Sequence, residues 1–171
     1  MEEKSLKIYN EVLKNIIYPF LGKKSTWGLD LTKLGNKLFK KNYAGTYSSN
    51  MIPDLGVVGI GGFFETKTNI DNISSDSKLY SCVNLDNSDE PGSHWIALAY
   101  DVYNGKIMIY DSFGRDTKII LPSLIEKYGK DNIVMSDDDS EQKIKEEDCG
   151  ARCMAFLYVF DRFGSKYAKT I

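Results

Sequence analysis

The chain has 171 residues, 42% of them hydrophobic and 12% aromatic, and a formal net charge of −2. These values suit a compact soluble protein, and we expect one domain over residues 1–171. Such a small net charge gives no overall field for binding nucleic acid, and no apolar run approaches the roughly 18 residues of a membrane span.

Two helices and a strand are expected in the amino-terminal part of the chain. Apolar residues at helical spacing between Leu6 and Ile17 predict the first helix, and we expect Pro19 to end it because proline breaks the hydrogen-bond pattern of a helix. Apolar residues between Leu31 and Phe39 predict a second, short helix. Asn42 to Pro53 then predicts a strand that runs into a turn.

The middle of the chain predicts the strands of a central sheet. Leu79 to Leu85 is one expected strand. Trp95 to Asp101 is apolar on both faces, which places it at the centre of the sheet. Asn104-Gly105 fits a two-residue hairpin turn that leads into a further strand, Lys106 to Asp111.

A mostly apolar segment after Cys149 predicts a buried helix. It runs from Ala151 to Phe160 and is bounded by Gly164, and Asp148 is the candidate N-cap. Cys149 therefore lies at a helix start, where the helix dipole favours a thiolate. The unpaired amide groups there can face a developing oxyanion.

His94 is the only histidine, so imidazole-dependent chemistry must use it. A thiol nucleophile needs a base that later protonates the leaving group, and a third group that orients this base. Asp111 is the candidate third group, yet the two-residue hairpin pairs it with Leu98, about 13 Å along the strand from His94. A bulge, a strong twist or a longer loop must then close the gap.

Each candidate also has a plain structural interpretation. A single histidine beside a tryptophan is usually a packed or surface residue. Asp111 can cap the turn that follows it, and Cys149 can be a small buried hydrophobe. Gln142, which becomes a candidate only through the family resemblance given below, lies in a stretch that otherwise looks like a solvated acidic loop. That resemblance depends on the order and spacing of the four residues together, rather than on any one of them.

The cysteines do not predict a metal site. Three cysteines and His94 formally make a Cys3His set, but no CxxC or HxxxH pair accompanies them, so we expect no zinc. Cys153, four residues after Cys149, is expected in the core, and Cys82 in a strand. The odd cysteine count and the absence of a secretory signal predict reduced thiols and an intracellular setting.

The arrangement resembles the adenovirus-type maturation proteases (adenain-like) and the related SUMO-specific proteases, whose papain-like site occurs in the order His, Asp or Glu, Gln, Cys. Gly-Ser-His-Trp at 92–95, Tyr-Asp-Ser-Phe-Gly at 110–114, Gln142 and Asp-Cys-Gly at 148–150 carry the resemblance. The spacing also matches, with 17 residues from His94 to Asp111 and 7 from Gln142 to Cys149. The match extends over residues 80–163, and four ordered elements are far more specific than one.

The resemblance implies an α+β, papain-like cysteine protease fold, with a central mixed sheet packed against the helix that starts at the nucleophile. It makes Cys149 the nucleophile, His94 the general base and acid, and Asp111 its orienting carboxylate. Gln142 and the Cys149 amide become the oxyanion donors. Substrate contacts are assigned to Gly45, Thr46, Tyr47 and Trp95.

The function implied is that of a cysteine endopeptidase from a virophage or other DNA virus. It is expected to cleave capsid or core precursors at small, glycine-containing sites, as a monomer without cofactors. Neither the DNA nor the peptide that activates the adenovirus enzyme is supported by these residues. The setting is the infected cytoplasm or viral factory, with packaging in the virion. The alternatives are a deconjugating protease for a ubiquitin-like modifier, an acyltransferase, and a non-catalytic binding module.

Overall fold

The structure is a computed structural model that describes residues 2–23, 28–48, 78–85, 94–101, 104–115, 125, 129–136 and 148–171. Its helices are α1 (Glu2–Val12), α2 (Tyr18–Leu21), α3 (Gly28–Phe39), α7 (Cys149–Phe163) and α8 (Ser165–Ala168). Its strands are β1 (Tyr43–Ser48), β2 (Lys78–Asn84), β3 (Trp95–Asp101), β4 (Lys106–Tyr110) and β5 (Ile133–Met135). None of the helices in these ranges is long and apolar enough to cross a membrane.

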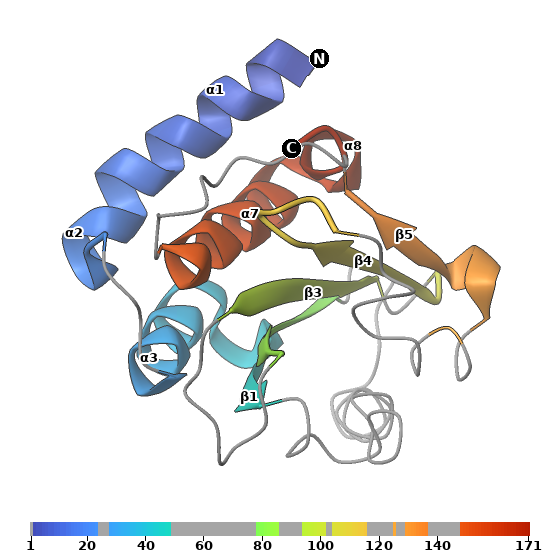
Figure 1. Ribbon diagram of the computed structural model, residues 1–171, viewed down its shortest axis with the longest axis horizontal. Coiled ribbons are helices and arrows are strands. Elements are labelled where there is room, and N and C mark those ends of the chain that lie inside the picture. Colours follow the sequence, from blue (N-terminus) through green and yellow to red (C-terminus); the bar gives the residue numbers. More distant parts are fainter. Residues whose placement is uncertain are drawn as a thin grey trace.

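The strands form a mixed sheet in the order β1-β2-β3-β4-β5 (Figure 1). β2, β3 and β4 are antiparallel neighbours, whereas β1 and β5 run parallel to β2 and β4 at the two edges. β3 is buried on both faces, which confirms the expectation of a central strand. The predicted α+β architecture with a mixed sheet is therefore observed, and β5 and α8 are additions that the sequence pattern did not predict.

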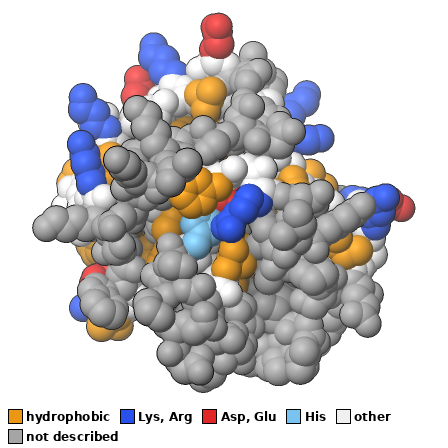
Figure 2. Space-filling view, in the orientation of Figure 1, with side chains coloured by type: hydrophobic (Ala, Val, Ile, Leu, Met, Phe, Trp, Pro, Cys, Tyr) orange, Lys and Arg blue, Asp and Glu red, His pale blue; other side chains and the backbone are white. Residues whose placement is uncertain are grey.

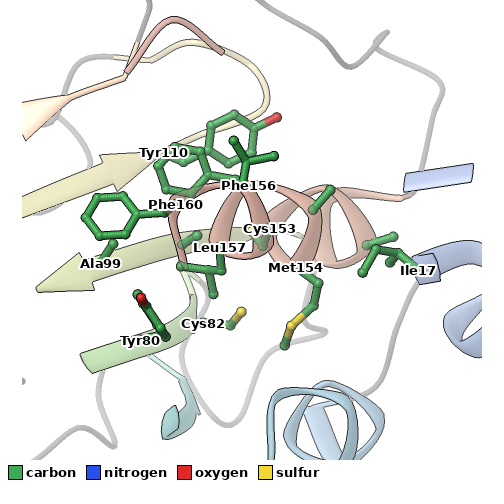
Figure 3. Packing of buried hydrophobic residues seen from close by; sticks show 14 of the residues in the cluster. Ile17, Tyr80, Cys82, Ala99, Tyr110, Cys153, Met154, Phe156, Leu157 and Phe160 are labelled. Carbon is green, nitrogen blue, oxygen red and sulfur yellow. The ribbon is translucent and has the colours of Figure 1, made fainter. Parts of the chain in front are cut away.

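α7 packs across one face of this sheet and forms the centre of the core. Phe156 and Phe160 are buried on α7, where Phe156 stacks on Tyr110 of β4 with ring centroids 4.7 Å apart (Figure 3). Phe160 meets Tyr80 of β2 edge-on at 5.9 Å. Aromatic pairs of this kind add about 0.5–1.5 kcal/mol beyond the burial of their area. These aromatic contacts hold the helix that begins at Cys149 against β2 and β4.

The amino-terminal helix differs from the prediction at its end. After α1 the backbone passes through a π-helical turn, Leu13–Ile17, and continues as α2, which contains Pro19 in its first turn. The expectation that Pro19 ends the helix was wrong. Proline is tolerated in the first turn of a helix because the amide it lacks has no partner there, and the π turn creates such a start within a longer helical run.

A tight contact between α3 and β1 gives a first testable prediction. A Cβ atom added to Gly35 would lie 2.6 Å from the ring of Tyr43, which is 6% exposed. We expect Gly35→Ala to lower the free energy of unfolding by about 1–3 kcal/mol through overpacking, although alanine has the better helix propensity. Urea unfolding monitored by circular dichroism measures this.

Gly28→Ala is the matched control, because the added Cβ would meet the Trp95 ring at an ordinary 3.5 Å. We expect its free energy of unfolding to stay within about 0.5 kcal/mol of wild type. Equal effects at both glycines would contradict the close packing of α3 on β1.

Candidate active site

The register of the β3–β4 hairpin brings Asp111 toward His94. Asp101 pairs with Lys106, so the connection spans residues 102–105, and Asp111 follows the Ala97–Tyr110 pair directly. The predicted two-residue hairpin was therefore wrong, because the loop has four residues and shifts Asp111 two positions closer to His94. Both residues lie just outside their strands, where the alternation of the pleat no longer sets side-chain direction.

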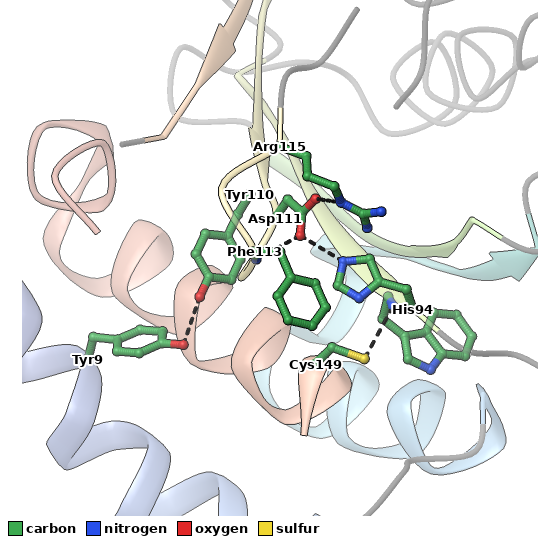
Figure 4. A network of polar contacts seen from close by, with 8 residues as sticks. Tyr9, His94, Tyr110, Asp111, Phe113, Arg115 and Cys149 are labelled. Carbon is green, nitrogen blue, oxygen red and sulfur yellow. Dashed lines mark hydrogen bonds and ion pairs between the residues drawn. The ribbon is translucent and has the colours of Figure 1, made fainter. Parts of the chain in front are cut away.

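His94 and Asp111 form a direct hydrogen bond. The distance from Nε2 of His94 to Oδ1 of Asp111 is 2.7 Å, and both side chains are buried (Figure 4). Burial alone lowers the pKa of His94, but the Asp111 hydrogen bond, the neighbouring Cys149 and the charge of Asp111 together raise it above 6.5. The contacts with Asp111 and Cys149 therefore favour the protonated form of His94.

Asp111 is held by donors on both carboxylate oxygens. Oδ1 also accepts from the amide of Phe113 at 2.9 Å, and Oδ2 accepts from Nε of Arg115 at 2.8 Å. Burial raises the pKa of Asp111, but the hydrogen bonds from His94, Phe113 and Arg115 outweigh burial and lower it below 3.8. One carboxylate therefore caps the turn that follows it and also bonds to His94.

Cys149 lies on the other side of the imidazole. It begins α7 and is 5% exposed, and the backbone amide of Trp95 lies 3.4 Å from its sulfur. Nδ1 of His94 makes no hydrogen bond to any residue that the structure describes, and Figure 4 shows this side of the ring directed toward Cys149. The imidazole thus stands between a carboxylate and a thiol, which is the geometry that thiol proteolysis requires.

His94 is 7% exposed, so a small part of this residue reaches the surface. It is visible in a hollow of the surface in Figure 2, next to hydrophobic and basic side chains. The ring of Phe113 stacks on His94 with centroids 4.8 Å apart. One face of the imidazole is therefore covered by an aromatic ring, which limits its rotation.

Asp148 occupies the N-cap position of α7 but does not cap it. Its side chain makes no capping hydrogen bond, and its carboxylate oxygens instead accept from Arg152 and Tyr18. The prediction of Asp148 as an N-cap holds for its position and was wrong for its side chain. The two donors, Nε of Arg152 and the hydroxyl of Tyr18, come from one turn later and from another helix, which local sequence pattern does not reveal.

The residues assigned to substrate binding are on β1 and at the start of β3. Gly45 has a φ of 130° beside a register shift in β1, and its carbonyl oxygen accepts from Oγ of Ser81 at 2.7 Å. The side chains of Thr46 and Trp95 both lie against Gly28. Tyr47 belongs to β1, but its side chain and the whole of Gln142 lie outside the described residues. Their substrate and oxyanion roles stay predictions.

Phe113 and Arg115 are site residues that the sequence analysis missed. Arg115 binds Asp111, and its guanidinium carbon lies 5.7 Å from the centre of the Phe113 ring. The sequence does place Arg115 four residues after Asp111, but outside a helix this spacing predicts no contact. The turn from Asp111 to Gly114, closed by a backbone hydrogen bond of 2.8 Å, creates it.

Arg115→Ala is expected to lower kcat/KM by about two- to fivefold. The Arg115 side chain is 46% exposed, and an exposed ion pair contributes only about 0–1 kcal/mol. Peptidase assays of Arg115→Ala and Arg115→Lys on the same substrate measure the loss, with the lysine variant expected between alanine and wild type. A loss above a hundredfold would show that Arg115 acts on the substrate rather than on Asp111.

The other two cysteines lie in the core. Cys82 and Cys153 are free and fully buried, as expected for a strand cysteine and a helix cysteine. Burial raises the pKa of the Cys153 thiol, and the neighbouring Cys82 raises it further. Within the described segments, no group of three or more metal-ligating side chains is assembled.

The chain is similar to known proteins in sequence and in fold. Residues 30–162 match the model of the Ulp1 protease family, C-terminal catalytic domain. A mimivirus protein (Acanthamoeba polyphaga mimivirus) that is named a thiol protease is 34% identical over 82 residues. That match covers 43% of this chain but only 27% of the mimivirus protein.

Solved structures of the SUMO protease Ulp1 share the fold. One, with its catalytic cysteine oxidised to a sulfenic acid, superposes with a TM-score of 0.52 at 18% identity and covers 99% of this chain and 88% of that one. Another, the Ulp1 protease domain bound to Smt3, the yeast ortholog of SUMO, has a TM-score of 0.54 at 15% identity and covers 99% and 90%. The chain belongs to the Ulp1 protease family and has the papain-like fold of the adenain and SUMO-protease type.

Proposed function

We propose that Cys149 is the nucleophile of this protease, His94 its general base and acid, and Asp111 the carboxylate that orients His94. The observation that carries the proposal is the single imidazole, bonded through Nε2 to Asp111 at 2.7 Å and directed through its other side at Cys149. Asp111 fixes the proton on Nε2, so Nδ1 is the atom that exchanges a proton with the thiol.

The reaction then follows from these positions. The Cys149 thiolate attacks the scissile carbonyl carbon, and the carbonyl electron pair moves to oxygen. The Cys149 amide at the start of α7 and, by the order of the motif, the side chain of Gln142 stabilise this oxyanion. His94 protonates the leaving amine, and water then hydrolyses the thioester and regenerates the thiol.

We propose that the substrates are capsid or core precursors of a DNA virus, cleaved at glycine-containing sites in the infected cell, its viral factories or the virion. The mimivirus relative and the adenovirus-type spacing of the motif support this proposal. A second candidate is deconjugation of a ubiquitin-like modifier. It is supported by the similarity to a protease solved in complex with a SUMO ortholog.

Two substrates tested in parallel separate the candidates. Wild-type protein and the Cys149→Ala variant are incubated with candidate viral precursor proteins and, separately, with a fluorogenic substrate derived from a ubiquitin-like modifier. Cleavage of the precursors by wild type but not by Cys149→Ala supports the role of a maturation protease. Hydrolysis of the modifier substrate at low enzyme concentration, with the precursors left uncleaved, would instead show a deconjugating protease. If neither substrate is cleaved and Cys149 is unreactive, the protein is a non-catalytic binding module.

A further inference from the structure

The start of α7 carries a buried ion pair beside the nucleophile. Aspartate is among the strongest N-cap residues, and its carboxylate normally accepts from the second or third amide of the helix. Asp148 is at this position with φ −98° and ψ 26°, yet it makes no capping hydrogen bond. Instead, Oδ1 accepts from Nε of Arg152 at 3.0 Å and Oδ2 accepts from the hydroxyl of Tyr18.

Arg152 is itself part of a buried chain of polar groups. It lies one turn after Asp148 and is 8% exposed, and one of its terminal nitrogens lies 3.4 Å from the hydroxyl of Tyr9 on α1. That hydroxyl shares a hydrogen bond of 2.8 Å with the hydroxyl of Tyr110, the residue before Asp111 (Figure 4). The chain of contacts therefore runs from the residue before the nucleophile to the residue before the orienting carboxylate.

This arrangement has a chemical consequence for Cys149. A carboxylate that capped α7 would occupy amides of the first turn and place a negative charge beside the sulfur. Both effects oppose a thiolate and an oxyanion, since the helix start favours them through its free amides and positive dipole end. Arg152, which stays charged at any working pH, neutralises Asp148, and the hydroxyl of Tyr18 donates to its second carboxylate oxygen.

Buried ion pairs rarely add net stability, because desolvation of the two charges costs about as much as their attraction returns. The position of this pair therefore suggests a role other than stability. We propose that Arg152 is a positioning residue that, together with Tyr18, holds the Asp148 carboxylate off the first amides of α7 and so leaves the helix start free for the Cys149 thiolate and the oxyanion. This inference rests on the proposed role of Cys149 as nucleophile.

The reactivity of Cys149 toward iodoacetamide across pH tests the proposal. Other titratable groups near the start of α7 in the described residues are His94 and Asp111 beyond the strands, Tyr9 on α1, Tyr18 on α2 and Cys153 on α7. All of these side chains remain present when Arg152 alone is replaced, although Tyr9 and Asp148 lose their contact with it. In Arg152→Met the uncompensated carboxylate should slow alkylation of Cys149 at pH 6 by about three- to tenfold and move the pH of half-maximal rate upward.

Kinetics and a second substitution separate this role from packing. We expect Arg152→Met to lower kcat with KM nearly unchanged, and Arg152→Lys to restore part of the loss. The double variant Asp148→Ala/Arg152→Met should react faster than Arg152→Met alone, because the carboxylate that Arg152 neutralises is gone. If the two substitutions add their losses instead, Arg152 serves packing only and the proposal is overturned.

Arg162→Met is the matched control. Arg162 is on the same helix and also pairs with an aspartate, since its Nε lies 3.2 Å from Asp161, but it is far along α7 from Cys149 and 48% exposed. We expect a wild-type alkylation profile. Should Arg152→Met fail to fold, Tyr18→Phe removes one hydroxyl and must give a smaller shift in the same direction; an unshifted profile would overturn the proposal. If wild-type Cys149 shows no enhanced reactivity, it is the proposed function that fails.

Discussion

His94→Ala is expected to abolish the selective alkylation of Cys149 by iodoacetamide below neutral pH and to lower kcat by about 10⁴- to 10⁶-fold. Without the imidazole, the thiol has no base beside it and the leaving amine has no proton donor. Losses of this size follow removal of one member of a catalytic unit, because the remaining members no longer act together. Mass spectrometry of the labelled cysteines and peptidase kinetics measure the two effects.

Cys82 and Cys153 serve as internal controls for this experiment. Both are fully buried, whereas Cys149 is 5% exposed, so part of the selectivity follows from access alone. The comparison with His94→Ala removes this ambiguity, because the smaller side chain leaves Cys149 at least as accessible. Equal, slow labelling of all three cysteines in the wild-type protein would contradict the assignment of Cys149 as the nucleophile.

Asp111→Asn is expected to lower the pKa of His94 relative to wild type and to reduce kcat by about 10⁴-fold. The asparagine has nearly the same shape, but it carries no charge, and it favours the wrong tautomer of the imidazole. Burial lowers the pKa of His94, and in this variant the charge of Asp111 no longer offsets that effect. Because the chain has one histidine, a single imidazole signal in an NMR titration reports this pKa directly.

The same titration predicts the pH dependence of stability. The native pKa of His94 lies above its ordinary value of about 6.5, so protonation favours the folded state. This contribution is complete below pH 6.5 and is lost as the pH rises through the native pKa. Asp111→Asn should flatten that decline in thermal unfolding experiments.

Asp161→Asn is the control for a change of charge elsewhere. Asp161 accepts from the hydroxyl of Tyr80 at 2.8 Å on the far part of α7. Its substitution should leave the histidine signal and kcat at wild-type values. A histidine pKa that is the same in Asp111→Asn and in wild type would show that the 2.7 Å contact does not govern His94 in solution.

Local patterns predicted the elements around the site well. β3 and the start of α7 were predicted at the residues where they occur, because alternation over a buried strand and an apolar run after a helix start are properties of neighbouring residues. The four-residue hairpin loop was missed, since Asn104-Gly105 alone fits a shorter turn. The prediction that Pro19 ends the first helix failed for a similar reason, because residue types alone do not indicate the π turn that precedes it.

The sequence by itself determined the chemistry available to this protein: one imidazole, one cysteine at a helix start, and a carboxylate between them in chain order. The tertiary structure decided which of these groups meet. Strand register set the distance from Asp111 to His94, and the packing of α7 on the sheet brought Cys149 to the other side of the ring. The tertiary structure also showed that Arg115 pairs with Asp111 and that Arg152 pairs with Asp148. The orientation of such charges depends on contacts that no local pattern encodes.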